Sequence, residues 1–559
     1  MRRRQWICNV VNVAFFLVGV LLVVAGLVLK LQVFPNIIKN TVIERKILGL
    51  NDDGTLNDFT KKWVNPSYVS TIQYWAFDYQ NTIGILNRAV YPDMNEIGPY
   101  TYDEIITNAN INFIDNQEKM QFSRTTKYVF NPKKSCTTCN PKKDNITIPD
   151  ISFFIGMQQI DLLVEKYMGN KTVIGLCQLF FKEKCTKLAK LIQKEIGIFM
   201  SIFKTQPFIT VTVDQLLFSG YVSPLVTNLA DRIIEILNRL LGTKYPQIDA
   251  SSHTVKLNDR LVAVPVLFIL SDSFGANSST PDHEMLALYR SASESRQDNK
   301  NDTADTLYTI ETGKVNQSRI GYIVHFENMN NSSVASQGNK LPSQWWPGAE
   351  KSGCDSTALS LEGTNGDFFK PFIKKNDSLP IYIPDICRTV KLEFGTKVSV
   401  KGIPGYRFLP PAEAFNYSLP ENCGFCNPKT LSRIVRSFVP RFTPSENDET
   451  TIDIEPNTGT VLSANKRLQI NALLNQFPHI GAYSVIRPGA YPLVWMNESF
   501  SIDMRTQNDL HSSIFQPEQF LNIVCWSSIG VGGFLMTLSA VLCSIRMGCF
   551  RYREAKKNN

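Results

Sequence analysis

The chain has little of what enzyme active sites are built from. Its 559 residues include only five histidines, and their spacing matches no metal-binding motif. There is no GxSxG turn, no HExxH helix and no glycine-rich phosphate loop. We therefore expect no catalytic residue, no cofactor and no metal site, and a non-enzymatic protein. The five histidines are His253, His283, His325, His479 and His511.

A strong excess of charge is also missing. The formal net charge of +8 is modest for this length, and part of it lies in the two tails. This composition gives no support to nucleic-acid binding. The 43% of hydrophobic residues, spread over a chain much longer than one typical domain, is ample for a sizeable core.

Two long apolar segments lie near the ends of the chain, at residues 10–29 and 521–545. At 1.5 Å per residue, each is long enough as a helix to cross a hydrocarbon core of roughly 30 Å. The first could instead be a cleaved signal peptide. Its apolar run is longer than the usual hydrophobic region of such peptides, and only Ala25 offers a weak cleavage position. We therefore favour two transmembrane helices, the first an uncleaved anchor.

Basic residues flank both apolar segments on their outer sides. Residues 2–4 are all arginine, and five further basic residues follow the second segment. The positive-inside rule then places tails 1–9 and 546–559 in the cytosol and residues 30–520 in one extracellular or lumenal ectodomain. Asn-x-Ser/Thr glycosylation acceptors agree, because all of them lie between the spans. They are Asn145, Asn170, Asn277, Asn301, Asn316, Asn330, Asn331, Asn376, Asn416 and Asn497.

The cysteines divide in the same way. Eight lie in the predicted ectodomain, where an oxidising compartment favours disulfides: Cys136, Cys139, Cys177, Cys185, Cys354, Cys387, Cys423 and Cys426. The two CxxC elements among them could together bind one zinc ion, but that compartment favours the disulfide interpretation. Cys8, Cys543 and Cys549 lie at the cytosolic edges of the spans, where they are candidates for palmitoylation or simply apolar-facing thiols.

The pattern of the ectodomain changes along the chain. Residues 98–102 predict a turn and an aromatic strand, residues 153–242 have helical periodicity, and residues 271–305 form a polar stretch typical of a surface loop. Strand-like alternation follows at 390–394, and at 452–455 and 468–470 around a turn at 456–459. We predict an α+β ectodomain with a helical insertion and an antiparallel body.

One face of the predicted helix at residues 182–204 is basic. At 100° per residue, Lys184, Lys187, Lys190 and Lys194 fall together, opposite an apolar face. The simplest interpretation is the solvated face of an amphipathic helix. The alternative is a binding site for anionic ligands, to which Lys204 could also contribute.

Six segments carry a resemblance to a known family. They are GPYTY at 98–102, DICR at 385–388, KGIPGYRF at 401–408, IDIEPNTG at 452–459, NKRLQIN at 465–471 and LVWMNES at 493–499. In this order, between two terminal spans, the chain resembles the class B scavenger receptors over essentially its whole length. The resemblance implies a β-barrel-like ectodomain, a helical bundle at its membrane-distal apex and an apolar tunnel that carries lipids towards the bilayer.

The resemblance also implies partners and disulfides. Lipids, fatty acids, sterols or lipoproteins are the expected ligands, with the basic helix as capture site, and a homo-oligomer is possible. By partial analogy, Cys354 pairs with Cys423 and Cys387 with Cys426, leaving Cys136 with Cys139 and Cys177 with Cys185 as local pairs. The ectodomain has no cysteine beyond Cys426, so the family pattern does not transfer whole.

The resemblance leaves two functions and several compartments open. We expect a plasma-membrane receptor that transfers apolar cargo; a trafficking carrier that binds a protein partner through the apex is the alternative. The terminal Lys556-Lys557-Asn558-Asn559 has the form of an endoplasmic-reticulum retrieval signal, or it only orients the span. Endoplasmic reticulum and endolysosomal membranes are therefore alternative locations.

Overall fold

The computed structural model describes most of the chain outside the predicted apical region. The described residues are 2–66, 70–88, 90–151, 153–154, 207–221, 247–249, 254–257, 260–263, 304–328, 361–383, 388–416, 419, 422, 448–474 and 486–557. The predicted helical bundle therefore lies almost entirely outside the described residues and stays a prediction.

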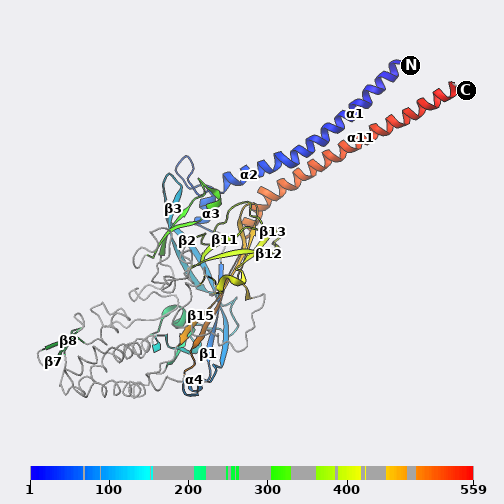
Figure 1. Ribbon diagram of the computed structural model, residues 1–559. Helices are drawn as coiled ribbons and strands as arrows, with labels where there is room; N and C mark the ends of the chain where they lie inside the picture. Colours follow the sequence, from blue (N-terminus) through cyan, green and yellow to red (C-terminus); the bar gives the residue numbers. More distant parts are fainter. Residues whose placement is uncertain are drawn as a thin grey trace.

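Each end of the chain forms a long apolar helix. α1 (Arg2–Val28) continues through a π-helical turn, η1 (Leu29–Val33), into α2 (Phe34–Arg45), and α11 (Gln516–Lys557) ends the chain. Both are long and apolar enough to span a membrane, as predicted. Figure 1 shows them side by side, extending away from the strands with both termini at the far end.

The two long helices touch through small residues. A Cβ atom on Gly19 would lie 2.7 Å from the Gly532 carbonyl oxygen, and one on Gly532 would lie 2.6 Å from that of Gly19. Asn12 Nδ2 donates to the Ser539 carbonyl at 3.1 Å, and Ser539 Oγ donates to the Asn12 carbonyl at 3.0 Å. Glycine is therefore needed here for the backbones to approach, which is how transmembrane helices commonly pack.

Eleven strands form one large sheet in which every neighbouring pair is antiparallel. Its order is β10-β9-β3-β2-β1-β16-β15-β14-β13-β12-β11. The strands are β1 (Ser70–Tyr79), β2 (Met94–Ile114), β3 (Lys119–Phe130), β9 (Ala304–Glu311), β10 (Ile323–Asn328), β11 (Leu379–Ile383), β12 (Arg388–Val400), β13 (Ile403–Leu409), β14 (Thr451–Glu455), β15 (Thr460–Leu474) and β16 (Gly489–Ser501). The α+β class and the strands predicted from alternation are confirmed.

One short segment links the two edges of this sheet. Thr364 forms a bridge to Tyr322, next to edge strand β10, and another to Ile381 of the opposite edge strand β11. The Tyr382 amide also donates to the Thr364 carbonyl at 2.9 Å. In the described residues, single bridges rather than a continuous ladder thus join the two edges, so the sheet is barrel-like without full closure.

The interior is filled at one end of the sheet. Burial alternates along β1, so Ile72 and Tyr74 point inward, and Tyr100, Tyr102 and Met496 join them in one packed cluster. A second sheet, β4 (Asn145–Pro149) paired with β5 (Phe208–Thr212), contributes to the same cluster. A third, remote sheet contains β6 (Gln247–Asp249), β7 (Thr254–Leu257) and β8 (Arg260–Ala263).

Two sequence predictions need correction here. The range 153–242 is not helical throughout, because β5 lies inside it; its Ile-Thr-Val-Thr run is rich in β-branched residues, which favour strands, and it pairs with β4. The polar stretch 271–305 also ends slightly earlier than predicted, since β9 begins at Ala304. At 208–212 the local composition and the strand pairing agree, and at 304–305 strand pairing extends into the polar stretch.

Short helices complete the end of the sheet nearest the long helices. They are α3 (Asp58–Val64), α10 (Met504–Leu510) and η11 (His511–Phe515), of which the last leads directly into α11. The remaining short elements are α4 (Thr82–Arg88), η2 (Gln215–Ser219), η3 (Gln317–Arg319) and η7 (Ala412–Phe415). α3 is capped by Asn57, whose side chain accepts a hydrogen bond from the Thr60 amide.

Candidate functional site

A cavity of about 490 Å³ lies inside the sheet at the end from which the long helices leave. Its wall includes Val42 of α2, Trp63 of α3, and Leu510 and Ile514 just before α11. The rest of the wall comes from the strands β1, β2, β3, β11, β12, β14, β15 and β16. The volume is in the range of cavities that hold small molecules.

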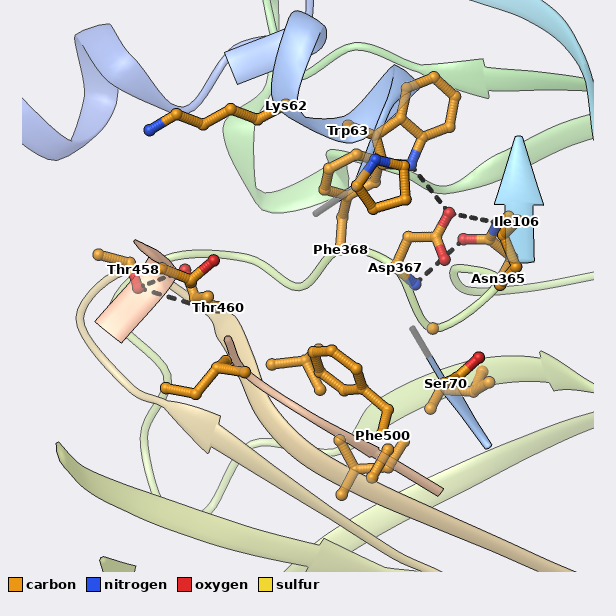
Figure 2. Close-up of a pocket in the computed structure, with 18 of the residues that line it drawn as sticks. Lys62, Trp63, Ser70, Ile106, Asn365, Asp367, Phe368, Thr458, Thr460 and Phe500 are labelled. Carbon is orange, nitrogen blue, oxygen red and sulfur yellow. Dashed lines mark hydrogen bonds between the residues drawn. The ribbon is translucent and has the colours of Figure 1, made fainter. Parts of the chain in front are cut away.

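Much of this wall is apolar. Trp63 and Phe368 pack with ring centroids 5.6 Å apart, and Phe368 is equally close to Phe59. Figure 2 shows the rings of Trp63, Phe368 and Phe500 around one open space. Further apolar lining comes from Ile106, Ile381, Ile383, Leu392, Ile452, Val461 and Ile502. Such a surface suits an apolar ligand.

Asp367 organises one polar corner of the cavity. Its carboxylate accepts hydrogen bonds from Trp63 Nε1 at 2.9 Å and from Asn365 Nδ2 at 3.0 Å, as Figure 2 shows. Arg124 of β3 forms an ion pair with the same carboxylate, and both side chains are largely buried. These bonds fix the 361–368 segment, which links the two edges of the sheet, against α3 and β3.

A second polar group lies on strands β1, β2, β15 and β16. Lys466 of β15 and Glu498 of β16 are directly opposite in register and form an ion pair. Ser70 Oγ donates to Glu104 Oε2 at 2.7 Å. Burial, together with the nearby charge of Glu498, raises the pKa of Glu104 to about 7, although the bond from Ser70 opposes the rise. Glu104 therefore changes charge near neutral pH.

Lys46, directly after α2, is the most deeply buried cation of the cavity wall. Its Nζ donates to the Thr458 carbonyl in the turn between β14 and β15. Burial lowers the pKa of Lys46 to about 7, and the nearby Glu455 opposes this shift. Glu455 itself accepts hydrogen bonds from the Asn457 and Thr458 amides at 3.0 and 2.7 Å. Lys46 thus joins the first long helix to the strands.

The structure places few of the residues singled out in the sequence. The lysines of the predicted basic face lie outside the described residues: Lys184, Lys187, Lys190, Lys194 and Lys204. So do six of the paired cysteines: Cys177, Cys185, Cys354, Cys387, Cys423 and Cys426. Cys136 and Cys139 form a disulfide with Cα atoms 5.1 Å apart. Of the candidates for palmitoylation, Cys543 is exposed on α11, and Cys8 and Cys549 lie within α1 and α11.

Five of the ten predicted glycosylation acceptors are described. Asn145, Asn316, Asn376 and Asn416 are exposed. Asn497 is only partly exposed, in the middle of the sheet, where its Nδ2 donates to Gln73 Oε1 at 3.3 Å. Its geometry therefore makes it a poorer acceptor than the other four.

Sequence reasoning did not single out the charged residues of the cavity. Two of them nevertheless fall in segments that carry the family resemblance: Lys466 in NKRLQIN and Glu498 in LVWMNES. Glu455, which acts on Lys46 from behind the wall, falls in IDIEPNTG. One signal in the sequence could have identified them. In a strand, alternate residues face the same side, and these charged residues occupy the same alternate positions as apolar ones that face the interior.

Comparison with known proteins agrees with the resemblance. The family model described as CD36 family matches residues 17–441 and 432–543. An uncharacterised Caenorhabditis elegans protein is 43% identical over the full length of both chains. Human lysosome membrane protein 2 is 26% identical, covering 88% of this chain and 87% of its own. Scavenger receptor class B member 1 of Cricetulus griseus is 24% identical, covering 96% and 90%. This chain, a membrane protein with two apolar terminal helices, belongs to the CD36 family.

Proposed function

We propose that this protein is a non-enzymatic lipid receptor that takes up the apolar part of a lipid in its cavity and delivers it towards the bilayer. The observation that carries the proposal is the position of the cavity. It is lined by aromatic and aliphatic side chains and lies between the strands and those ends of the two long helices that are next to the sheet. Relatives named as a class B scavenger receptor and a lysosome membrane protein support a receptor in a membrane.

Filling the cavity tests this proposal. Ala464 lines it from β15, so Ala464→Trp would occupy part of the volume that a lipid chain needs. The wild type and this variant are purified in mild detergent, and the lipids extracted from each are measured by mass spectrometry. We expect the variant to contain less lipid than the wild type. Val129→Trp on an exposed position of β3 is the matched control. Equal lipid content in all three proteins would contradict the proposal, as would turnover of a radiolabelled lipid ester by the wild type.

We propose further that the basic face in the predicted apical helix captures anionic ligands before transfer. Its support is the one-sided arrangement of lysines in the sequence. Reversing Lys187, Lys190 and Lys194 to Glu should abolish binding of anionic liposomes, because repulsion then replaces attraction. Wild-type binding should weaken as salt rises, since charges on an exposed surface are screened beyond about 8 Å at physiological ionic strength.

A matched control for this reversal lies in the loop between β3 and β4. Lys133, Lys142 and Lys143 are exposed there, so the same triple change to Glu alters net charge equally at another place. If both triple variants reach the surface and bind liposomes alike, the basic face is only a solvated helix.

Disulfides and topology complete the proposal. We propose that both tails are cytosolic and that Cys354 pairs with Cys423 and Cys387 with Cys426. Closing loops of this kind contributes about 2 to 4 kcal/mol, chiefly by restricting the unfolded chain. Non-reducing peptide mapping should recover these two links, and stoichiometric zinc in the purified protein would contradict them.

A further inference from the structure

Four residues on the central strands form a polar band across the inner face of the sheet: Ser70, Glu104, Lys466 and Glu498. Register pairs Ser70 with Glu104, Ile72 with Glu498, and Glu498 with Lys466. Residues opposite one another in a sheet project from the same face. Ile72 is buried in the packed interior, so its neighbours in the band also face inward.

This band forms the floor of the cavity. Ser70, Lys466 and Glu498 line the cavity directly. On the far side of the band, Ile72 and Met496 belong to the packed cluster and are almost fully buried. A ligand that fills the apolar cavity therefore meets this polar surface at its inner end.

The charges around the floor are mostly paired. Arg124 pairs with Asp367, and Lys466 pairs with Glu498. Glu104 is 6% exposed and accepts a hydrogen bond from Ser70; among the described residues it forms no ion pair. The polar band itself therefore holds two carboxylates, Glu104 and Glu498, and one cation, Lys466, so it has one extra carboxylate. The other lysines of the cavity wall, Lys46 and Lys62, lie outside the band.

Burial of this extra carboxylate has a measurable consequence. The groups that act on Glu104 are Ser70 on β1, Arg124 on β3, Lys466 on β15 and Glu498 on β16. Burial and Glu498 raise its pKa to about 7 against the opposing effects of the other three. Glu104 is therefore ionised above this pH and neutral below it.

We propose that the polar band binds the head group of a single-chain amphiphile and prefers an ammonium head to a carboxylate head. This inference rests on the proposed lipid-receptor function and names the class of ligand. An ammonium would balance the extra carboxylate and donate hydrogen bonds to Glu498 and Ser70. A carboxylate head would instead add a like charge in a poorly solvated place, which is unfavourable.

The proposal also fixes the direction of the pH dependence. An ammonium favours the ionised form of Glu104, so its binding releases a proton from that carboxyl into solvent. Lowering the pH from 7.5 to 5.5 protonates Glu104 and should reduce the advantage of the ammonium over an uncharged head.

Three ligands with the same C18 chain separate the head from the tail. The full-length protein in mild detergent is loaded with tritiated oleyl alcohol, which is then displaced by oleylamine, oleyl alcohol or oleate. At pH 7.5 we expect oleylamine to displace the tritiated oleyl alcohol with an apparent affinity at least about tenfold higher than that of oleate. Tenfold corresponds to about 1.4 kcal/mol. Its advantage over oleyl alcohol should fall several-fold at pH 5.5.

Glu104→Gln provides the variant test, since its amide oxygen can still accept the bond from Ser70. It should lose most of the preference for oleylamine, whereas Glu393→Gln at an exposed position of β12 should keep it. Should Glu104→Gln fail to fold, the wild-type pH series still decides. Three outcomes would overturn this inference alone. They are equal displacement by oleylamine and oleate at pH 7.5, an oleylamine advantage that is unchanged at pH 5.5, and an oleylamine advantage that is unchanged in Glu104→Gln. Failure of the wild type to bind oleyl alcohol overturns the proposed function as well.

Discussion

Replacing Lys46 by Met should make the folded protein more stable. Lys46 is 5% exposed, and its Nζ donates to the Thr458 carbonyl. Burial lowers its pKa from 10.5 to about 7, which means that folding disfavours the charged ammonium. Met has a similar length and no charge to desolvate, so the substitution removes this cost while keeping much of the packing.

The size of the effect follows from the pKa. Because each pKa unit corresponds to about 1.4 kcal/mol, a fall from 10.5 to about 7 costs on the order of 4 kcal/mol at pH 7. Loss of the hydrogen bond to Thr458 offsets about 1 to 3 kcal/mol of this gain. Glu455 needs no cation, because two backbone amides and the Thr458 hydroxyl already donate to it. The net result is a stabilisation of about 2 kcal/mol.

Burial of Lys46 also makes the stability of the wild-type protein depend on pH. Between pH 7 and 10.5 the unfolded chain holds the Lys46 proton more firmly than the folded protein, so wild-type stability rises with pH in this window. The cost of burying Lys46 falls from about 4 to about 2 kcal/mol between pH 7 and 9. The advantage of Lys46→Met should therefore shrink over the same range.

Thermal unfolding in mild detergent, followed by tryptophan fluorescence at pH 7, 8 and 9, measures this effect. Lys62→Met is the matched control, since Lys62 forms a half-exposed pair with Asp509 and should change stability by less than about 1 kcal/mol. A Lys46→Met variant that melts below the wild type at pH 7, or a gap that does not narrow towards pH 9, would refute this reasoning.

Three further predictions concern the membrane helices. Gly19→Val should lower expression and melting temperature, because its side chain would collide with the Gly532 carbonyl, whereas Gly533→Val, where a Cβ meets nothing within 4 Å, should be tolerated. Epitope tags at both ends should stain only permeabilised cells; staining of intact cells would contradict cytosolic tails. Replacing Lys556 and Lys557 by Ser should change surface abundance little, and a large rise with loss of endoglycosidase H sensitivity would reveal a retrieval signal.

The sequence alone determined the parts of this protein that depend on local pattern. The apolar runs at 10–29 and 521–545 predicted both long helices, because a helix long and apolar enough to cross a bilayer needs no tertiary information. Alternation at 452–455 and the Pro-Asn-Thr-Gly turn predicted the hairpin of β14 and β15 for the same reason. The family could also be recognised from the sequence, because the order of its motifs along the chain requires no tertiary information.

Only the tertiary structure decided where the cavity lies and which charges face it. A charged residue that alternates with apolar ones looks the same whether its face is solvated or enclosed. Lys466 and Glu498 become cavity residues only because register and sheet curvature place them inside. Likewise, Lys46 is unremarkable in the sequence until the chain brings it to Thr458, 412 residues away, where burial removes water from its ammonium group and lowers its pKa.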